Sequence, residues 1–293
     1  MAASVRRKPR PGRARVQTGS LPLFAAARRK QSVAADLAEL GERPPHLSTG
    51  LPSVDRALRG GFPVGGLTLV AARRQGGASS LLVGASLNAL ARGQRVAYFS
   101  ERTEEAKLKG RLVVQESRVN GYRIHAGFIS AEDRLALVAA RERIPWHALT
   151  VRCQKRIPTD TVDTDLFAYR PWLTVADIRP RAPEASGRSD RLDAVSEGLQ
   201  RLRLLAQRHR VAMVVRMILP QGGHPPDRAE LPGVGAVAAL ADAVMFVHRD
   251  LDGSAGRAEA MIIRVADADV EPRIIPLRFD QRFAGLLEPS PQA

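Results

Sequence analysis

The sequence has one cysteine, few aromatic residues and no long apolar run. Cys153 is the single cysteine among 293 residues, which excludes an intrachain disulfide and a cysteine-based zinc cage. The six histidines are scattered without metal-ligand spacing, so we expect no structural metal. No apolar stretch approaches the roughly 20 residues that span a bilayer. These absences favour a protein of a reducing compartment without a membrane span, and we expect it in the cytoplasm.

The first part of the chain lacks acidic residues. Asp36 is the first of them, and the nine cations that precede it leave +6 of the net charge of +15 to the rest of the chain. Such a basic arm attracts polyanions through counterion release, without sequence preference. Three interpretations stay open, namely a solvated disordered tail, a nucleic-acid contact, and membrane or targeting use. The candidates for a DNA contact in this arm are Arg6, Arg7, Lys8 and Arg10.

Composition and periodicity divide the chain into segments. The first residues combine Pro, Gly and Arg without periodicity, which is typical of disorder, and the next have helical spacing of apolar residues. The remainder alternates apolar runs with helical patterns. The predicted segments are a disordered basic tail (1–20), a linker-type helix (21–45), one α/β domain (46–285) and a C-terminal tail (286–293).

The α/β part predicts a mostly parallel central sheet flanked by helices. Its strand-like runs are almost continuously apolar, as expected for strands covered on both faces. The last runs follow one another closely, which favours an antiparallel edge. The expected strands are 66–72, 95–100, 148–152, 172–178, 211–218, 243–249, 258–265 and 273–279. The expected helices between them are 80–91, 104–117, 131–144 and 191–210.

The stretch AARRQGGASS (71–80) lies between an expected strand and an expected helix, where a phosphate-binding loop belongs. Ser79 stands at the position of the Mg²⁺ ligand, whereas Ala78 stands where such loops carry the lysine that reaches the phosphates. The residues alone leave two interpretations, a plain turn and a nucleotide site without its lysine. The candidate nucleotide-binding residues are Arg73, Gly76, Gly77, Ala78, Ser79 and Ser80.

Several motifs follow one another along the chain. In order, they are LSTGLPSVDRALRGGFPVGGLTLVAARRQGGASS (47–80), RVAYFSERTEEAKLKGRL (95–112), WLTVADI (172–178) and GVGAVAALADAVMFVHRD (233–250). Together they resemble the C-terminal motor domain of DnaB-type replicative DNA helicases, over roughly residues 46–282. The resemblance implies a RecA-like P-loop NTPase fold, ATP and Mg²⁺ as cofactors, and a hexameric ring. It also implies that Asp177 is the Walker B acid, which would bind Mg²⁺ together with Ser79.

The sequence departs from the family pattern at the positions that the family uses for ATP hydrolysis. The lysine position is Ala78, and the position of the catalytic glutamate is Arg102, with Glu101 one place early. A slip at the strand end would bring Glu101 into use as a displaced catalytic residue, whereas regular strand alternation points it to the other face. The γ-phosphate sensor falls near Ile218, and the arginine finger near Ala266. A finger alone contributes about 10³–10⁵ in rate, so we expect weakened ATP and Mg²⁺ binding and weak or absent hydrolysis.

Two further expectations concern the surroundings of Asp177. An ion pair between Asp177 and a nearby arginine is favoured over a Mg²⁺ site shared with Glu101. The helix that precedes the Walker B strand in the family is replaced here by residues 154–171.

The loop RPRAPEASGRSDR (179–191) after the Walker B strand is a candidate DNA contact. Its cations could pair with phosphates, although a solvated arginine-rich loop is the alternative. It contains no aromatic residue, so base stacking is not expected there and the affinity should fall with salt. The candidate residues are Arg179, Arg181, Arg188 and Arg191.

Three functional hypotheses follow. The first is a degenerate motor of DNA replication or DNA metabolism, which binds single-stranded or non-specific DNA or a replication protein and turns over little or no ATP. The second is an active ATP-dependent DNA helicase with a rearranged site. The third is a protein-interaction scaffold with a basic tail. The resemblance implies a hexamer, but the missing lysine and finger weaken the nucleotide contacts between subunits, which favours a monomer or a weak ring. Nucleoid association would accompany DNA binding.

Overall fold

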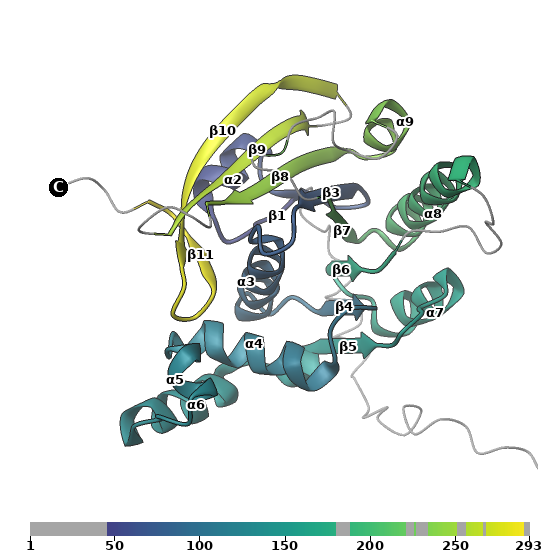
Figure 1. The fold of residues 1–293 in the computed structure, drawn as a ribbon. Coiled ribbons are helices and arrows are strands. Elements are labelled where there is room, and N and C mark those ends of the chain that lie inside the picture. The colour runs from purple at the N-terminus through teal and green to yellow at the C-terminus, as the bar shows by residue number, and fades with distance from the viewer. Residues whose placement is uncertain are drawn as a thin grey trace, which may run out of the picture. The chain divides into compact units, whose positions relative to one another are not determined.

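The computed structural model describes residues 46–179, 188–220, 226, 234–250, 256–265 and 268–289 (Figure 1). The predicted basic tail and linker-type helix, and with them Arg6, Arg7, Lys8 and Arg10, lie outside these residues, as does Arg181.

A nine-stranded sheet with the order β11-β10-β9-β8-β3-β7-β6-β4-β5 forms the centre of the fold. The six strands from β8 to β5 run parallel to one another, and β9, β10 and β11 extend the sheet in antiparallel fashion. The predicted mostly parallel sheet with an antiparallel edge is therefore confirmed. The strands are β3 (Leu67–Ala72), β4 (Val96–Ser100), β5 (Leu149–Cys153), β6 (Leu173–Asp177), β7 (Ala212–Ile218), β8 (Ala243–Arg249), β9 (Arg257–Val265), β10 (Ala268–Asp280) and β11 (Gly285–Leu287). A separate two-stranded sheet pairs β1 (His46–Leu47) with β2 (Phe62–Pro63).

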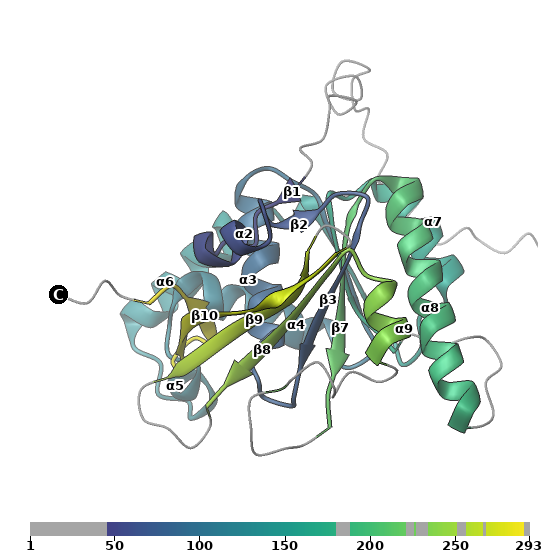
Figure 2. The same cartoon turned by 90° about the horizontal axis from the view of Figure 1, so that it is seen from above.

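Helices cover both faces of the sheet. Helices α3, α4, α5 and α6 lie on one side, and α7, α8 and α9 lie on the other, as two perpendicular views agree (Figures 1 and 2). The helices are α2 (Pro52–Ala57), α3 (Ala78–Ala91), α4 (Glu105–Ser117), α5 (Gly121–His125), α6 (Ala131–Arg143), α7 (Thr159–Tyr169), α8 (Arg188–His209) and α9 (Val234–Ala239). A 3-10 turn, η2 (Trp146–Ala148), leads into β5.

Two hydrophobic cores result from this layering. Successive strand residues point to opposite faces, so in β3 the side chain of Val70 packs with α3 whereas that of Leu69 packs with α8. All six residues of β3 are buried, which explains why its sequence is continuously apolar. The two cores fix the sheet between its helix layers and thereby fix the positions of the strand ends.

The structure contains short elements that the sequence analysis did not expect, namely α2, α5, α9, β1, β2 and β11. Strand β11 includes residues 286 and 287, which the sequence analysis assigns to the C-terminal tail.

Two of the longer helices also differ from the expectations. Residues 159–169 form α7, so the expected replacement of the helix before β6 is wrong. The acidic residues of this segment obscured its helical pattern. One of them, the buried Asp165, accepts two hydrogen bonds from Arg152 at 2.5 and 2.8 Å. Helix α8 begins at Arg188, three residues before the expected start, which places Arg188 and Arg191 in the helix and not in the preceding loop.

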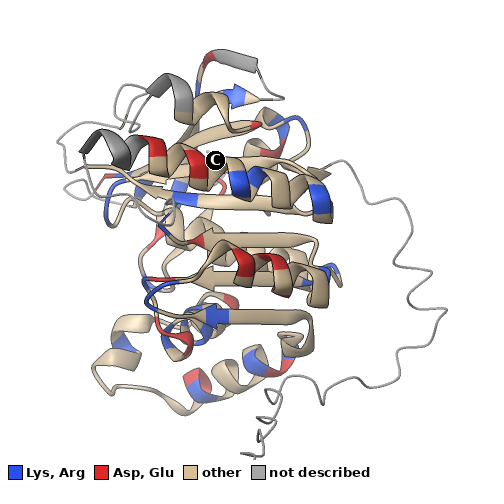
Figure 3. Ribbon diagram, turned by 90° about the vertical axis from the view of Figure 1, so that its right-hand side faces the viewer, with Lys and Arg blue, Asp and Glu red and all other residues tan. Residues whose placement is uncertain are grey.

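The outer face of α7 and α8 carries charges of both signs (Figure 3). Arg201 pairs with Glu197 on α8 at 2.6 Å, and Arg208 of α8 pairs with Asp163 of α7 at 3.1 Å. Such exposed pairs contribute little to stability, but they leave this helical face without a strong excess of positive charge. Within the described ranges, no helix is both long enough and apolar enough to cross a membrane.

The packing of α3 predicts the effect of one substitution in the first core. Leu82 is fully buried, and Leu82→Ala should lower the free energy of unfolding by about 2–5 kcal/mol, because a cavity replaces the lost methyl groups. Urea unfolding measures this loss. Leu204, which is 57% exposed on α8, is the matched control, and Leu204→Ala should change the stability by less than about 1 kcal/mol. Equal losses at the two positions would contradict the assigned core.

Candidate nucleotide site

The candidate site lies where neighbouring parallel strands end together. Strands β3, β7, β6 and β4 are adjacent in this order, and their carboxyl ends share one edge of the sheet. Ligand sites of open parallel sheets form at such an edge. The loop after β3, the end of β6 and the turn after β4 therefore come together there.

The loop between β3 and α3 has the tight geometry that its glycines predicted. Gln75 and Gly77 adopt positive φ angles of 64° and 100°, and α3 begins directly afterwards at Ala78. A Cβ atom at Gly77 would lie 3.3 Å from a methyl carbon of Val247, so both the backbone angle and the space favour glycine. Ala78 is 2% exposed and presents only a methyl group. The loop thus keeps its shape without the charge.

Arg73 is directed toward the neighbouring strand end. Its Nε donates a hydrogen bond to the carbonyl oxygen of Pro220, which follows β7, at 3.1 Å. The backbone of Leu219 also donates to the carbonyl of Ala72 at 2.9 Å. Arg73, which is 9% exposed, therefore ties the ends of β3 and β7 together. Arg74 is exposed in the same loop.

Asp177, at the tip of β6, is held between two arginines. The Nη1 of Arg216 on β7 donates to its Oδ2 at 3.1 Å, and the Nε of Arg102 after β4 lies 3.1 Å from its Oδ1. The Ser100 hydroxyl on β4 lies 3.5 Å from Oδ2. The side chains of Asp177, Arg216 and Arg102 are 3%, 14% and 23% exposed. The predicted ion pair between Asp177 and an arginine is thus formed twice, and we call these three residues the Asp177 cluster.

Burial dominates the ionisation of the Asp177 cluster. It raises the pKa of Asp177 above its ordinary value, against the opposing effect of Arg216 and Arg102. Burial likewise lowers the pKa of Arg102, against the attraction of Asp177. Each charge is therefore costly by itself at this place, and each is tolerated because the opposite charges are adjacent.

Glu101 points to the opposite face of the sheet, as alternation predicts. Its Oε1 accepts a hydrogen bond from the backbone N–H of Ile157 at 3.0 Å, and its Oε2 accepts one from that of Arg179 at 3.1 Å. Ile157 belongs to the second core, on the side of α7. Glu101 therefore fastens the chain segments after β5 and β6, and its carboxylate is directed away from the Asp177 cluster.

The remaining candidates are distributed around this edge. Ser79 and Ser80 lie half-buried in the first turn of α3, and the carbonyl of Ser80 accepts a hydrogen bond from Gln115. Arg179 is exposed directly after β6. Near the expected position of the arginine finger, the Nε of Arg264 donates a hydrogen bond to the carbonyl oxygen of Ala241 at 2.7 Å. Ala266 lies outside the described residues.

Arg216 is the site residue that the sequence analysis missed. Its signal was an arginine inside the apolar run VAMVVRMI (211–218), at a position that shares a face with Val214 of the first core. An ionisable side chain inside a buried strand needs a counter-charge, and the adjacent strand β6 supplies Asp177. Which strands are adjacent is set by the sheet order, which the sequence did not specify.

The Mg²⁺ ion that a P-loop fold implies does not fit Asp177 in this arrangement. Both carboxylate oxygens face guanidinium groups, and a divalent cation there would meet two positive charges at short range. Among the described residues, no cluster of three or more His, Cys, Asp or Glu side chains is arranged to hold a metal ion. Ala78 provides no charge for a phosphate.

Solved structures place this architecture in the RecA-like class of P-loop folds. The chain is similar to a DnaB-like replicative helicase studied with its interactions with primase, with a TM-score of 0.73 and 16% identity over 88% of this chain and 65% of that one. It is also similar to a solved ATPase domain (TM-score 0.72, 16% identity, 88% of this chain and 97% of that one). The KaiC-like protein PH0186 from Pyrococcus horikoshii OT3 is more distant (TM-score 0.57, 13% identity, 83% and 97% coverage).

Sequence comparison identifies the family within this class. Residues 46–283 match the family described as DnaB-like helicase C terminal domain, so the chain belongs to that family. The replicative DNA helicase DnaB of Treponema pallidum (strain Nichols) is 28% identical over 261 residues, which cover 84% of this chain and 56% of that protein. The chain thus spans little more than half the length of this relative.

The Asp177 cluster predicts that removing its one negative charge lowers the stability more than replacing all three of its residues. Asp177→Ala should lower the free energy of unfolding by about 3–5 kcal/mol, because it leaves two adjacent arginines without their shared counter-charge. Urea unfolding of the full chain checks this.

Replacing the whole cluster supplies the control. The triple variant Arg102→Met, Asp177→Leu and Arg216→Met should recover most of the loss, since apolar side chains of similar size need no compensation. If Asp177→Ala left the stability unchanged, or if the triple variant lost more than Asp177→Ala, the assigned role of the two arginines would be wrong.

Proposed function

We propose that this chain is a DnaB-helicase-like domain that binds DNA and hydrolyses ATP weakly or not at all. Membership of the family supports a role in DNA replication or DNA metabolism. The single observation that carries the proposal is the pairing of Asp177 with Arg102 and Arg216. A carboxylate that is already compensated by two fixed cations has little to offer a metal ion.

The other parts of the site support the same conclusion. Ala78 stands at the lysine position, and Glu101 is bound to two backbone N–H groups on the opposite face. Phosphoryl transfer depends on positioned charges around the phosphates, and three of those charges are missing or engaged here. The loop after β3 still offers backbone N–H groups at the start of α3, so weak nucleotide binding without turnover is compatible with the geometry.

The DNA-binding part of the proposal rests on charge. The chain carries +15, and nine cations precede the first acidic residue. Arg179 is exposed at the carboxyl edge of the sheet, and the sequence has another arginine, Arg181, two positions further on. Such an arrangement binds phosphates without reading the sequence of bases. We propose single-stranded or non-specific DNA as the ligand and a replication protein as a further partner, with a hexameric ring or a weaker assembly of subunits.

Nucleotide turnover is the direct test of the degenerate site. Wild type and Ala78→Lys should both release phosphate from ATP at the background rate in the presence of Mg²⁺, since the lysine alone does not free Asp177. Calorimetry on the same two proteins should give tighter ATP binding for Ala78→Lys, because the added ammonium group reaches the phosphates. Hydrolysis above background that Asp177→Asn abolishes would favour an active helicase with a rearranged site.

Salt dependence is the test of DNA binding. The full chain should bind a single-stranded oligonucleotide, and a site with about four phosphate contacts should lose roughly fifty-fold in affinity between 50 and 200 mM salt. Fluorescence anisotropy of a labelled oligonucleotide measures this. A form without residues 1–45 should bind more weakly and with a smaller salt slope, because it lacks the acid-poor arm. Absence of any salt-dependent binding by the full chain, with protein partners retained by the shortened form, would support the scaffold hypothesis instead.

A further inference from the structure

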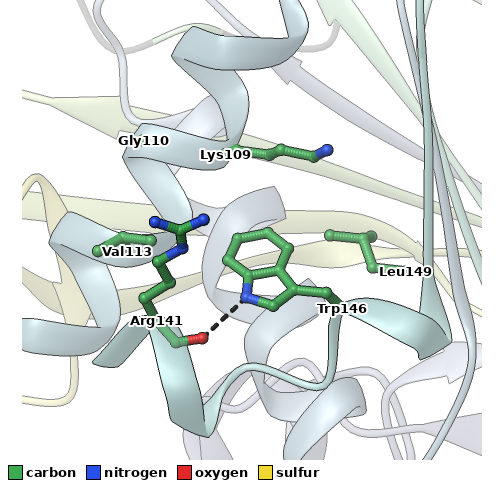
Figure 4. A pocket seen from close by; sticks show the side chains of 6 residues that line it. All are labelled: Lys109, Gly110, Val113, Arg141, Trp146 and Leu149. Carbon is green, nitrogen blue, oxygen red and sulfur yellow. Dashed lines mark hydrogen bonds between the residues drawn. The ribbon is translucent and has the colours of Figure 1, made fainter. Parts of the chain in front are cut away.

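A surface pocket of about 340 Å³ is shown in Figure 4, and neither the loop after β3 nor the Asp177 cluster contributes to its lining. Helices α4 and α6, the turn η2 and the edge strand β5 form it. Its volume is within the range of small-ligand sites in proteins. The lining residues are Lys109, Gly110, Val113, Arg141, Trp146 and Leu149.

The indole of Trp146 is the largest apolar surface in this pocket. Its Nε1 donates a hydrogen bond to the carbonyl oxygen of Arg141 at 2.8 Å (Figure 4), and the ring packs partly against the first core. The part of the indole that lines the pocket is therefore ring surface and not the N–H group. Val113 and Leu149 add aliphatic surface on either side (Figure 4). A flat apolar ring is therefore the group that this part of the pocket accommodates best.

Two cations line the pocket next to the indole. Arg141 is exposed on α6, and its guanidinium group has no ion-pair partner among the described residues. Lys109 on α4 pairs with Glu105 of the same helix at 2.6 Å, an exposed contact that an incoming anion can replace at little cost. An aromatic face beside such cations suits a ligand that joins a ring to a negative charge.

The absence of a side chain at Gly110 of α4 adds space to the pocket. Gly110 lies inside this helix, where glycine is less favourable than alanine. A Cβ atom added at Gly110 would meet no atom within 4 Å. Packing therefore does not require a glycine there, and its absent side chain leaves room beside Trp146.

We infer that this pocket binds one nucleotide unit of single-stranded DNA, with its base on the face of Trp146 and its phosphate between Lys109 and Arg141. This inference rests on the proposed DNA binding and adds a stacking contact to it. An acidic peptide would also satisfy the cations. Its backbone N–H and C=O groups, however, would face the apolar walls and an indole N–H that is already engaged, which is unfavourable.

Fluorescence of the full chain provides the first measurement. The protein has two tryptophans, and Trp172→Phe makes Trp146 the single indole reporter. An oligothymidylate should quench this fluorescence on binding, because stacked bases quench an indole, whereas an abasic oligonucleotide of equal length should not. Equal quenching by the abasic strand, or quenching by polyglutamate, would overturn the assignment of a stacked base.

Matched substitutions provide the second measurement. Gly110→Leu fills the pocket, and Arg141→Glu reverses its charge, so each should weaken oligothymidylate binding by about fivefold or more. The controls are Gly110→Ala, which should raise the thermal midpoint and keep the affinity within about twofold, and Arg134→Glu, at an exposed position of α6 outside the pocket. Comparable affinity changes in test and control variants would contradict the inference.

The two proposals fail in different ways. If the chain binds single-stranded DNA while Trp146 stays unquenched and Gly110→Leu and Arg141→Glu bind like their controls, only the pocket assignment is wrong. If the full chain shows no DNA binding at low salt, the proposed function fails and this contact fails with it.

Discussion

The ion cluster of Arg102, Asp177 and Arg216 is the interaction on which the carboxyl edge of the sheet depends. It joins the ends of three neighbouring strands, β4, β6 and β7, around one buried carboxylate. A charge in such a place is stable only if an opposite charge compensates it, and a metal ion or an arginine can do this equally well. Here two arginines do so, and their ion pairs with Asp177 are structural contacts between the strand ends.

The other polar residues at this edge have similarly structural partners. Arg73 donates a hydrogen bond to the carbonyl oxygen of Pro220. Glu101 accepts hydrogen bonds from the backbone N–H groups of Ile157 and Arg179. Each of these contacts connects a strand end to a neighbouring chain segment. In the described part of this edge, these side chains therefore bind other groups of the protein. The glycine-containing loop between β3 and α3 lies next to it, with only a methyl group at Ala78.

The residues that build the fold and the polar residues at the strand ends are different sets. The two hydrophobic cores and the sheet order depend on apolar residues, and these follow the pattern of DnaB-like helicase C-terminal domains along residues 46–283. The charges that phosphoryl transfer needs are not part of such cores, so a fold of this kind can form with or without them. Positive charge is retained instead in exposed places, at Arg179 and beside Trp146, where it can act on a polyanion.

The sequence by itself determined the eight longer strands, most of the long helices and the parallel character of the sheet, because periodicity and continuous apolar runs depend on local burial. The short strands β1, β2 and β11 were missed. It also determined the absence of charge at Ala78 and the direction of Glu101 toward the opposite face of the sheet, since both follow from spacing within one segment. Helix α7 was missed because its acidic residues, such as Asp165, are compensated by a partner on another strand. The pairing of Asp177 with Arg216 and the pocket at Trp146 were decided by tertiary structure alone. Both bring together residues distant in the chain, and only the order of strands and the packing of helices determine which such residues meet.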